Sequence, residues 1–229
     1  MLMLMLCYII IFCTTGSSFY LLKEGKYQFQ LVRTGESSKK AKSEGGGGGG
    51  HWSQGLLSSM NDPEYLLLST ADFVIIRDKY PKSKHHFLVI PKKPINKIDD
   101  LVKEDEKLLE DMEAEARGFV TKYSESEFLF GYHSQPSMSQ LHLHVISSDF
   151  VSDCLKHKKH WNSFNTDFFL SSQSVIHQLK EEGRVRTPTS GQAKDLLSLP
   201  LKCNQCGNFP KNIPDLKRHL KDHLERKRK

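Results

Sequence analysis

Cysteine is scarce in this sequence, and its scarcity excludes one class of protein. The 229 residues contain five cysteines, of which only Cys203 and Cys206 are close enough in sequence to suggest a shared bond or ligand. Small secreted domains that depend on disulfides carry many more cysteines for their length. The pair is therefore better suited to a metal site than to a disulfide framework.

Long hydrophobic runs are also lacking. The opening MLMLMLCYIIIFC is almost wholly apolar but ends at Cys13, whereas a helix needs about 20 apolar residues to span a bilayer. The first charge is Lys23, so the basic start of a signal peptide is missing too. The sequence favours an atypical or divergent start over an export signal, and no membrane partner is expected.

Length and composition fit one domain with a small additional module, because a core needs roughly 100–150 residues to bury most of its surface. Residues 33–50 combine charge, Ser and six consecutive Gly, a composition that does not form a core. We expect residues 1–50 to be a disordered linker with an apolar N-terminal segment. The net charge of +6 is modest, and it is concentrated toward the C-terminal half.

Alternating and β-branched runs predict five strands, at 65–69, 72–78, 86–91, 128–133 and 141–147. Residues 98–123 place apolar side chains at three- and four-residue intervals, which predicts an amphipathic helix of about 25 residues. Residues 166–182 predict a second helix capped by Asn165 or Thr166. Strands, helix and further strands indicate an α+β fold.

Residues 133–149 hold the most chemically distinctive pattern, HSQPSMSQLHLHVISSD. On a strand, His142 and His144 project from the same face. The loop before them contains Ser137, whose hydroxyl and backbone N–H suit phosphate oxygens. A neutral imidazole beside a phosphate can act as nucleophile toward phosphorus. A metal pair or a hydrogen-bonded polar pair is the alternative for two such histidines.

The C-terminal module has the spacing of a zinc finger. Cys203-x2-Cys206 is followed after twelve residues by His219-x3-His223, four ligands suited to one tetrahedral Zn²⁺. The helix is expected to begin after Pro214. The prolines of the finger indicate that its usual hairpin is altered, so base reading by the helix is not assumed.

Basic residues gather at 154–165, expected to be a loop at the mouth of the site, and along the finger helix. Lysine and arginine side chains neutralise phosphates, while Trp161 suits stacking on a base or anchoring a core. The terminal RKRK (226–229) is a basic tail that favours nuclear localisation. The predicted DNA contacts are Lys156, Lys158, Lys159, His160, Trp161, Lys217, Arg218 and Lys221.

Together these motifs resemble the histidine-triad (HIT) family. HSQPSMSQLHLHVIS resembles the family signature, while DKYPKSKHHFLVIP (78–91) and CLKHKKHWNSFNTDFF (154–169) resemble its zinc-finger-bearing DNA-repair branch. The resemblance covers about residues 51–223. One position departs from it: where the family commonly reads H-x-H-x-H, this chain has Gln140 in place of the first histidine.

The resemblance implies a HIT-like antiparallel sheet with packed helices, followed by a small zinc-finger module. It implies a catalytic domain at 51–182, a connector at 183–200 and a C2H2-type finger at 201–225, ahead of the basic tail.

Roles for individual residues also follow from the resemblance. His142 would attack the phosphorus of an AMP group and form a covalent AMP-histidine that water resolves. His144 would orient it, and His86 and His133 would bind the phosphate or protonate the leaving group. The implied nucleotide-binding residues are Asp78, Lys82, Ser137 and Gln140.

The activity implied is hydrolysis of a phosphoanhydride bond, removing AMP from 5′-adenylated DNA ends left by abortive ligation. The implied cofactor is one structural Zn²⁺. The implied partners are nicked or double-stranded DNA, RNA-containing ends and the product AMP. Relatives often carry a forkhead-associated domain, which residues 1–50 are too short to form, so docking of phosphoproteins by that route is not expected.

Two alternatives stay open. The first is a nucleoside phosphoramidase or dinucleotide hydrolase, although a small substrate needs neither the finger nor the basic segment. The second is a DNA-binding protein whose catalysis is impaired by Gln140. Restoring histidine at position 140 raises the rate if Gln140 is a defect, and leaves it unchanged if the site is adapted to glutamine.

Overall fold

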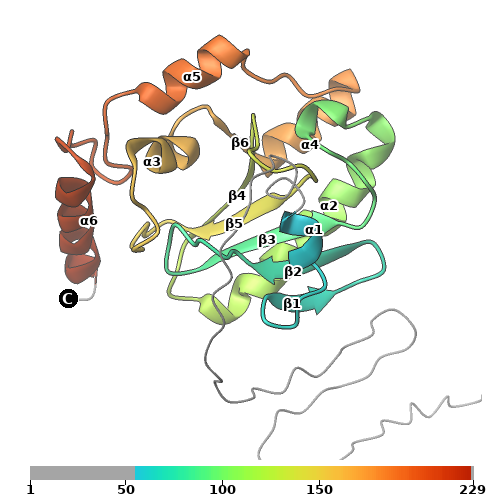
Figure 1. The fold of residues 1–229 in the computed structure, drawn as a ribbon, viewed down its shortest axis with the longest axis horizontal. Coiled ribbons are helices and arrows are strands. Elements are labelled where there is room, and N and C mark those ends of the chain that lie inside the picture. The colour runs from blue at the N-terminus through green and yellow to red at the C-terminus, as the bar shows by residue number, and fades with distance from the viewer. Residues whose placement is uncertain (1–54, 228–229) are drawn as a thin grey trace, which may run out of the picture.

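An antiparallel sheet organises the chain, with helices on both of its faces (Figure 1). The structure, a computed structural model, describes residues 55–227. The predicted linker and apolar opening, the first residues of the predicted catalytic domain and the last two of the basic tail lie outside this range. No helix within residues 55–227 has the length and apolar character needed to cross a bilayer.

The six strands run in the order β1-β2-β3-β5-β4-β6, and every neighbouring pair is antiparallel. The first five coincide with the predicted strands, which confirms the α+β fold. Their bounds are β1 Leu66–Ser69, β2 Phe73–Arg77, β3 His86–Pro91, β4 Phe128–His133, β5 Leu143–Ser147 and β6 Phe169–Ser171.

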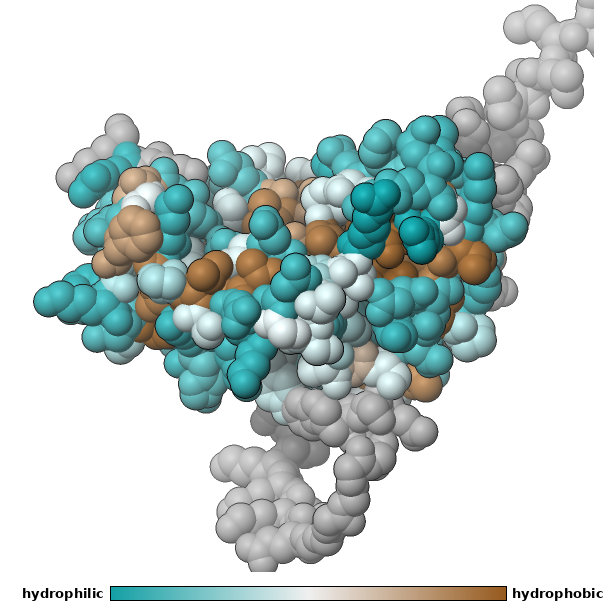
Figure 2. Space-filling model, turned by 90° about the horizontal axis from the view of Figure 1, so that it is seen from above, coloured by the Kyte–Doolittle hydropathy of each residue, from teal (hydrophilic) through white to brown (hydrophobic). Residues whose placement is uncertain are grey.

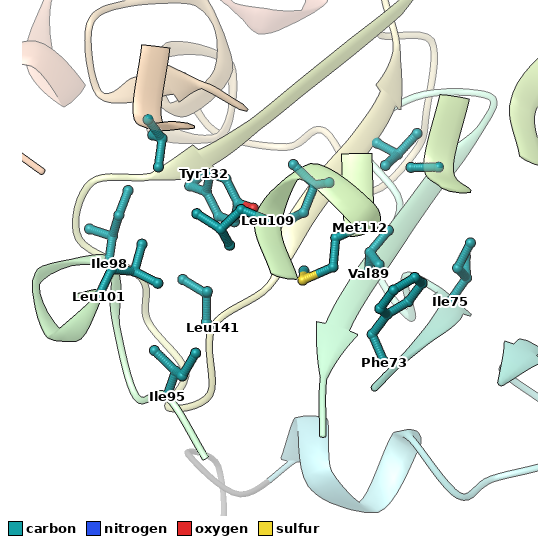
Figure 3. Close-up of a cluster of buried hydrophobic side chains, with 14 of the residues drawn as sticks. Phe73, Ile75, Val89, Ile95, Ile98, Leu101, Leu109, Met112, Tyr132 and Leu141 are labelled. Carbon is teal, nitrogen blue, oxygen red and sulfur yellow. The ribbon is translucent and has the colours of Figure 1, made fainter. Parts of the chain in front are cut away.

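The main core lies between one face of the sheet and the helices α2 (Glu106–Val120) and α4 (Ser172–Glu182). Every second residue of β3 and β5 points into it, as strand geometry requires. Figure 3 shows Leu109 and Met112 of α2 among strand residues of this core. The opposite residues of the same strands, including His86 and His144, therefore face the other side of the sheet.

That second face carries two smaller apolar clusters. One packs α1 (Gly55–Ser59) against β2 and β3. The other joins β5 to α3 (Lys158–Asn165) and α6 (Ile213–Lys227). Leu216 and Leu220 of α6 are fully buried beside Ile146 of β5, so the predicted finger shares a core with the sheet.

The helix predicted at 98–123 is shorter than expected. Two 3-10 turns, Ile98–Asp100 and Lys103–Asp105, precede α2, and a third, Thr121–Tyr123, follows it. Asp105 explains the late start, because its carboxylate accepts a hydrogen bond of 3.1 Å from the Val102 N–H. An aspartate that bonds nearby backbone in this way favours a turn over a continuing helix.

The helix predicted at 166–182 is wrong in its first third. Residues Phe169–Ser171 form β6 by pairing with β4, and the helix begins only at Ser172. The Ser171 hydroxyl caps it by accepting from the Ser174 N–H at 3.2 Å. Two other segments expected to be irregular, within 154–165 and 183–200, contain the helices α3 and α5 (Ser190–Ser198).

Gly131 of β4 generates a test of the packing behind the histidines. It pairs with His144, and an added Cβ would clash with the backbone carbonyl oxygen of Leu170 and lie 2.7 Å from the Phe169 ring. We expect Gly131→Ala to lower the free energy of unfolding by about 1–3 kcal/mol, measured by urea denaturation. Gly118→Ala in α2, where nothing lies within 4 Å, should instead raise it by about 0.5–1 kcal/mol. Equal effects would contradict this account.

Candidate catalytic site and zinc-binding finger

A cavity of about 610 Å³ lies on the sheet face opposite α2. Strand alternation brings histidines from three neighbouring strands to it, because β5 lies between β3 and β4. All four predicted catalytic histidines line it: His86, His133, His142 and His144. Other predicted site residues in its wall are Asp78, Lys82, Ser137, Lys156, Lys159 and His160.

His142 is held in a nucleophilic form. Its Nδ1 lies 2.9 Å from the carbonyl oxygen of Gln140. Since a carbonyl can only accept, Nδ1 carries the proton and Nε2 carries the lone pair. Burial lowers the pKa of His142, outweighing the opposing effects of the Gln140 bond and Asp78, so the ring is neutral at pH 7.

A chain of hydrogen bonds fixes the tautomers of the next two rings. The backbone N–H of Lys82 donates to Nδ1 of His86 at 3.2 Å, so the His86 proton sits on Nε2. That Nε2 lies 3.0 Å from Nδ1 of His144 and donates to it. His144 must then carry its own proton on Nε2.

Burial keeps these rings neutral. Desolvation is the largest cause of the lowered pKa of His86, which falls to about 4 even with the Asp78 carboxylate 3.4 Å away. Burial and neighbouring histidines lower the pKa of His144 and His133 well below the usual value. The cluster therefore offers neutral imidazoles as donors and acceptors across the ordinary pH range.

Two polar atoms of this cluster could bind a ligand. Nε2 of His144 and Nε2 of His133 are buried without a hydrogen-bond partner among the residues that the structure describes. The two ring centroids are 4.3 Å apart. A buried polar atom without a partner costs about 1–3 kcal/mol, and an anionic oxygen between these rings would accept from both, provided that His133 also carries its proton on Nε2.

Phe164 of α3 supports the histidines from the outside, a role that the sequence did not reveal. Its ring centroid lies 4.6 Å from that of His133, 5.2 Å from that of His144 and 5.6 Å from that of His86. The available signal was its position three residues after Trp161, which places both on the buried face of a helix.

Gln140 lies outside the cavity wall, contrary to its prediction as a nucleotide contact. Its side-chain nitrogen donates to the carbonyl oxygens of Pro91 at 2.6 Å and Lys93 at 2.9 Å, so both amide hydrogens are used. Its φ of 79° lies in the left-handed region. Gln140 thus ties the end of β3 to the start of β5 and aims its carbonyl at His142.

The interpretation of Trp161 as a base-stacking residue is wrong. Its side chain is 1% exposed, and its Nε1 donates to the carbonyl oxygen of Lys202 at 3.0 Å. It anchors the segment before the finger to the catalytic domain. Lys158 also lies outside the cavity wall, because its ammonium donates to the Ser198 carbonyl oxygen at 2.8 Å.

Asp78, His86 and His144 present ligand atoms within 4.8 Å of one another, which is a possible geometry for a metal ion. However, both ring nitrogens of His86 already take part in hydrogen bonds. A metal here would have to break that chain, so the hydrogen-bonded arrangement fits the residues better.

The four predicted finger ligands converge on one point. Cys206 Sγ lies 3.1 Å from His219 Nε2, and Cys203 Sγ lies 3.6 Å from His223 Nε2. All four ligand atoms are within 4.8 Å of one another. Tetrahedral zinc, with bonds of about 2.3 Å to sulfur and about 2.0 Å to nitrogen, separates such atoms by about 3.5 Å. The donor set and its geometry both suit Zn²⁺.

The finger lacks the usual hairpin, since residues 201–212 form turns and no strand. Gly207 adopts a φ of 71°, and its N–H bonds back to the Cys203 carbonyl oxygen at 3.2 Å. The helix α6 begins at Ile213, before Pro214 rather than after it. The Asn212 side chain accepts from the Asp215 N–H at 2.9 Å and so caps the helix.

A second cavity of about 730 Å³ separates α6 from the loop before α3. The two cavities have Lys156 in common. The other basic residues that line the second cavity are Lys217, Arg218 and Lys221, all predicted DNA contacts.

Residues 51–160 match the family model described as scavenger mRNA decapping enzyme C-terminal binding, and residues 165–226 match a C2HE / C2H2 / C2HC zinc-binding finger. The chain is 30% identical over 214 residues to an aprataxin-like protein of Saccharomyces cerevisiae, covering 74% of this chain and 94% of that one. The chain belongs to the aprataxin family. Among family members, aprataxin of Danio rerio is 48% identical over 178 residues, covering 76% of this chain.

The chain spans only about half the length of that relative, 54% of the Danio rerio aprataxin. The solved structure of Hnt3 in complex with DNA and guanosine superposes with a TM-score of 0.57 and 25% identity, covering 75% of this chain and 94% of that one. These matches confirm the resemblance of this aprataxin-family chain to HIT proteins with a zinc finger.

The bonds of Gln140 predict the outcome of restoring the family histidine. A neutral imidazole has one N–H, so Gln140→His loses at least one of the two bonds to Pro91 and Lys93. We expect this variant to be about 1 kcal/mol less stable toward unfolding because of the lost bond. Its turnover of 5′-adenylated DNA, the substrate that the resemblance implies, should stay within about threefold, because the backbone carbonyl of residue 140 that orients His142 is retained. Urea denaturation and steady-state kinetics measure the two effects. A tenfold gain in turnover would show that Gln140 is a defect.

Proposed function

We propose that the protein is a DNA-repair hydrolase that removes AMP from 5′-adenylated DNA ends. The observation that carries this proposal is the state of His142, which is neutral, has its lone pair on Nε2 and lines the cavity. The same cavity contains two buried imidazole nitrogens that lack hydrogen-bond partners among the described residues. A nucleophile beside the unpaired N–H of His144 suits phosphoryl transfer, where charge develops on phosphate oxygens.

In the first step, His142 Nε2 forms a bond to the phosphorus of the adenylate, and the bond from that phosphorus to the bridging oxygen breaks. The electron pair leaves with the 5′-phosphate of the DNA. His144 donates its Nε2–H to a non-bridging oxygen, as the hydrogen-bond chain from Lys82 through His86 allows. In the second step, water bonds to phosphorus, the P–N bond breaks, and AMP is released with one proton to solvent.

The second cavity, here called the basic groove because Lys156, Lys217, Arg218 and Lys221 line it, supports DNA as the substrate. Lys156 lines both cavities, so a backbone entering the catalytic cavity can continue along Lys217, Arg218 and Lys221 of α6. The solved relative with DNA and guanosine is of the same family and fold. A nuclear location accords with such a substrate and with the basic end of the chain. RNA-containing ends share the chemistry at phosphorus.

The finger is proposed to hold one Zn²⁺, bound by Cys203, Cys206, His219 and His223. The ion would fix the ends of the finger relative to α6, a structural role, because all four positions of a tetrahedral site are filled by protein. It takes no part in the steps at phosphorus.

Replacing the nucleophile tests the reaction. His142→Ala should lower AMP release from a 5′-adenylated nicked duplex by about 10³-fold or more, because no covalent intermediate can form. Binding of the nicked duplex should be unchanged. The matched control is His177→Ala, an exposed histidine of α4 outside the cavity wall, which should keep full activity.

Other results would overturn the assignment. Substantial AMP release by His142→Ala would remove His142 as the nucleophile. Wild-type protein that binds the duplex tightly without releasing AMP would favour the impaired DNA-binding alternative. Equal rates on a small adenosine phosphoramidate and on adenylated DNA would favour the phosphoramidase.

Salt dependence tests the proposed path of the DNA. Each phosphate neutralised in a duplex contributes about 0.9 to the slope of log affinity against log salt. Replacing Lys217, Arg218 and Lys221 by Ser should therefore reduce the slope by up to about 3, measured by fluorescence anisotropy. Replacing Lys107, Lys180 and Lys194, which lie outside both cavity walls, should leave it unchanged. Equal slopes for the two triple variants would exclude the α6 groove.

A further inference from the structure

The helix α5 forms part of the catalytic cavity, although its segment was expected to be only a connector. Leu197, near its C-terminal end, lines the cavity together with Phe164 of α3. Figure 1 shows α5 lying along α3 at the edge of the molecule. Figure 2 views the molecule from above Figure 1 and shows a surface that is mostly hydrophilic, with apolar residues gathered between polar ones.

Polar contacts hold α5 in place more than apolar burial does. Of its nine residues, all of which the structure describes, only Ala193 is buried. Asn162 of α3 is 1% exposed, and its amide nitrogen donates to the carbonyl oxygens of Leu197 at 3.0 Å and Leu199 at 2.8 Å. One buried side chain thus fixes the end of α5 that carries Leu197.

The cavity wall formed by Phe164 of α3 and Leu197 of α5, here called the α3–α5 wall, is on the side from which DNA would enter. Lys156, which joins the two cavities, closely precedes α3, and Lys159, His160 and Phe164 of α3 line the catalytic cavity beside Leu197. Asp78 and Lys82 line it from the segment between β2 and β3. The α3–α5 wall is therefore continuous with the basic groove that leads to α6.

We propose that Leu197 is a specificity-determining residue, which provides the apolar contact for the 5′-terminal nucleotide of the DNA strand. Asn162 is a positioning residue that acts through Leu197. This inference rests on the proposed function for its substrate, but its binding test is independent of turnover. A small adenylate has no DNA strand, so it should depend on Leu197 less than the duplex does.

The experiment compares Leu197→Ala with Leu196→Ala, a neighbouring half-buried leucine of α5 outside the cavity wall. Two ligands are used, a nicked duplex with a 5′-phosphate for binding and a small adenosine phosphoramidate for turnover. We expect Leu197→Ala to weaken duplex binding about 5- to 10-fold, because an apolar contact is lost, and to lower kcat/KM for the phosphoramidate by a smaller factor. Leu196→Ala should change neither.

Asn162→Ala should reproduce the selective loss of duplex binding, since the wall is then displaced. Leu197→Met, which conserves volume, should restore binding to near the wild-type value. Equal effects of Leu197→Ala on both ligands, or none on the duplex, would overturn the inference. Failure of the wild type to release AMP from adenylated DNA would instead contradict the proposed function, while the binding comparison would still decide the role of Leu197.

Discussion

Burial of four imidazole rings on one face of the sheet is the constraint on which the site depends. Desolvation disfavours the charged form of each ring and lowers its pKa, so the histidines stay neutral. In His86, His142 and His144, hydrogen bonds then decide which nitrogen carries the single proton. The Lys82 N–H begins this ordering at His86, and the Gln140 carbonyl begins it at His142. Two backbone groups thus fix the tautomers of three of the four rings.

This dependence explains why the strand register matters to the chemistry. A shift of one residue in β5 would turn His142 and His144 into the main core and bring Leu143 and Val145 to the cavity. The pairing of Leu88 with His144 across β3 and β5, together with the α2 core, opposes such a shift. Stability of the core and placement of the histidines are therefore set by the same contacts.

The strands, the clustering of the four histidines and the convergence of the four finger residues were predictable from the sequence, because each leaves a local pattern. Period-two alternation marks β3 and β5, and fixed spacing marks Cys203, Cys206, His219 and His223. What the sequence could not supply depends on distant partners. Trp161 is a core residue only because Lys202 and Phe150 meet it, and β6 forms only because β4 lies beside it. The local sequence of the β6 segment had predicted the start of a helix instead.

The burial of Leu216 and Leu220 beside Ile146 has a geometric consequence for the whole molecule. A finger on a flexible tether would sample many distances from the histidine cluster, but α6 shares a packed core with the strand that carries His144. The span from the finger lysines to the cavity is thus a fixed length. A DNA strand that reached both, as proposed above, would therefore span the same distance whatever its base sequence.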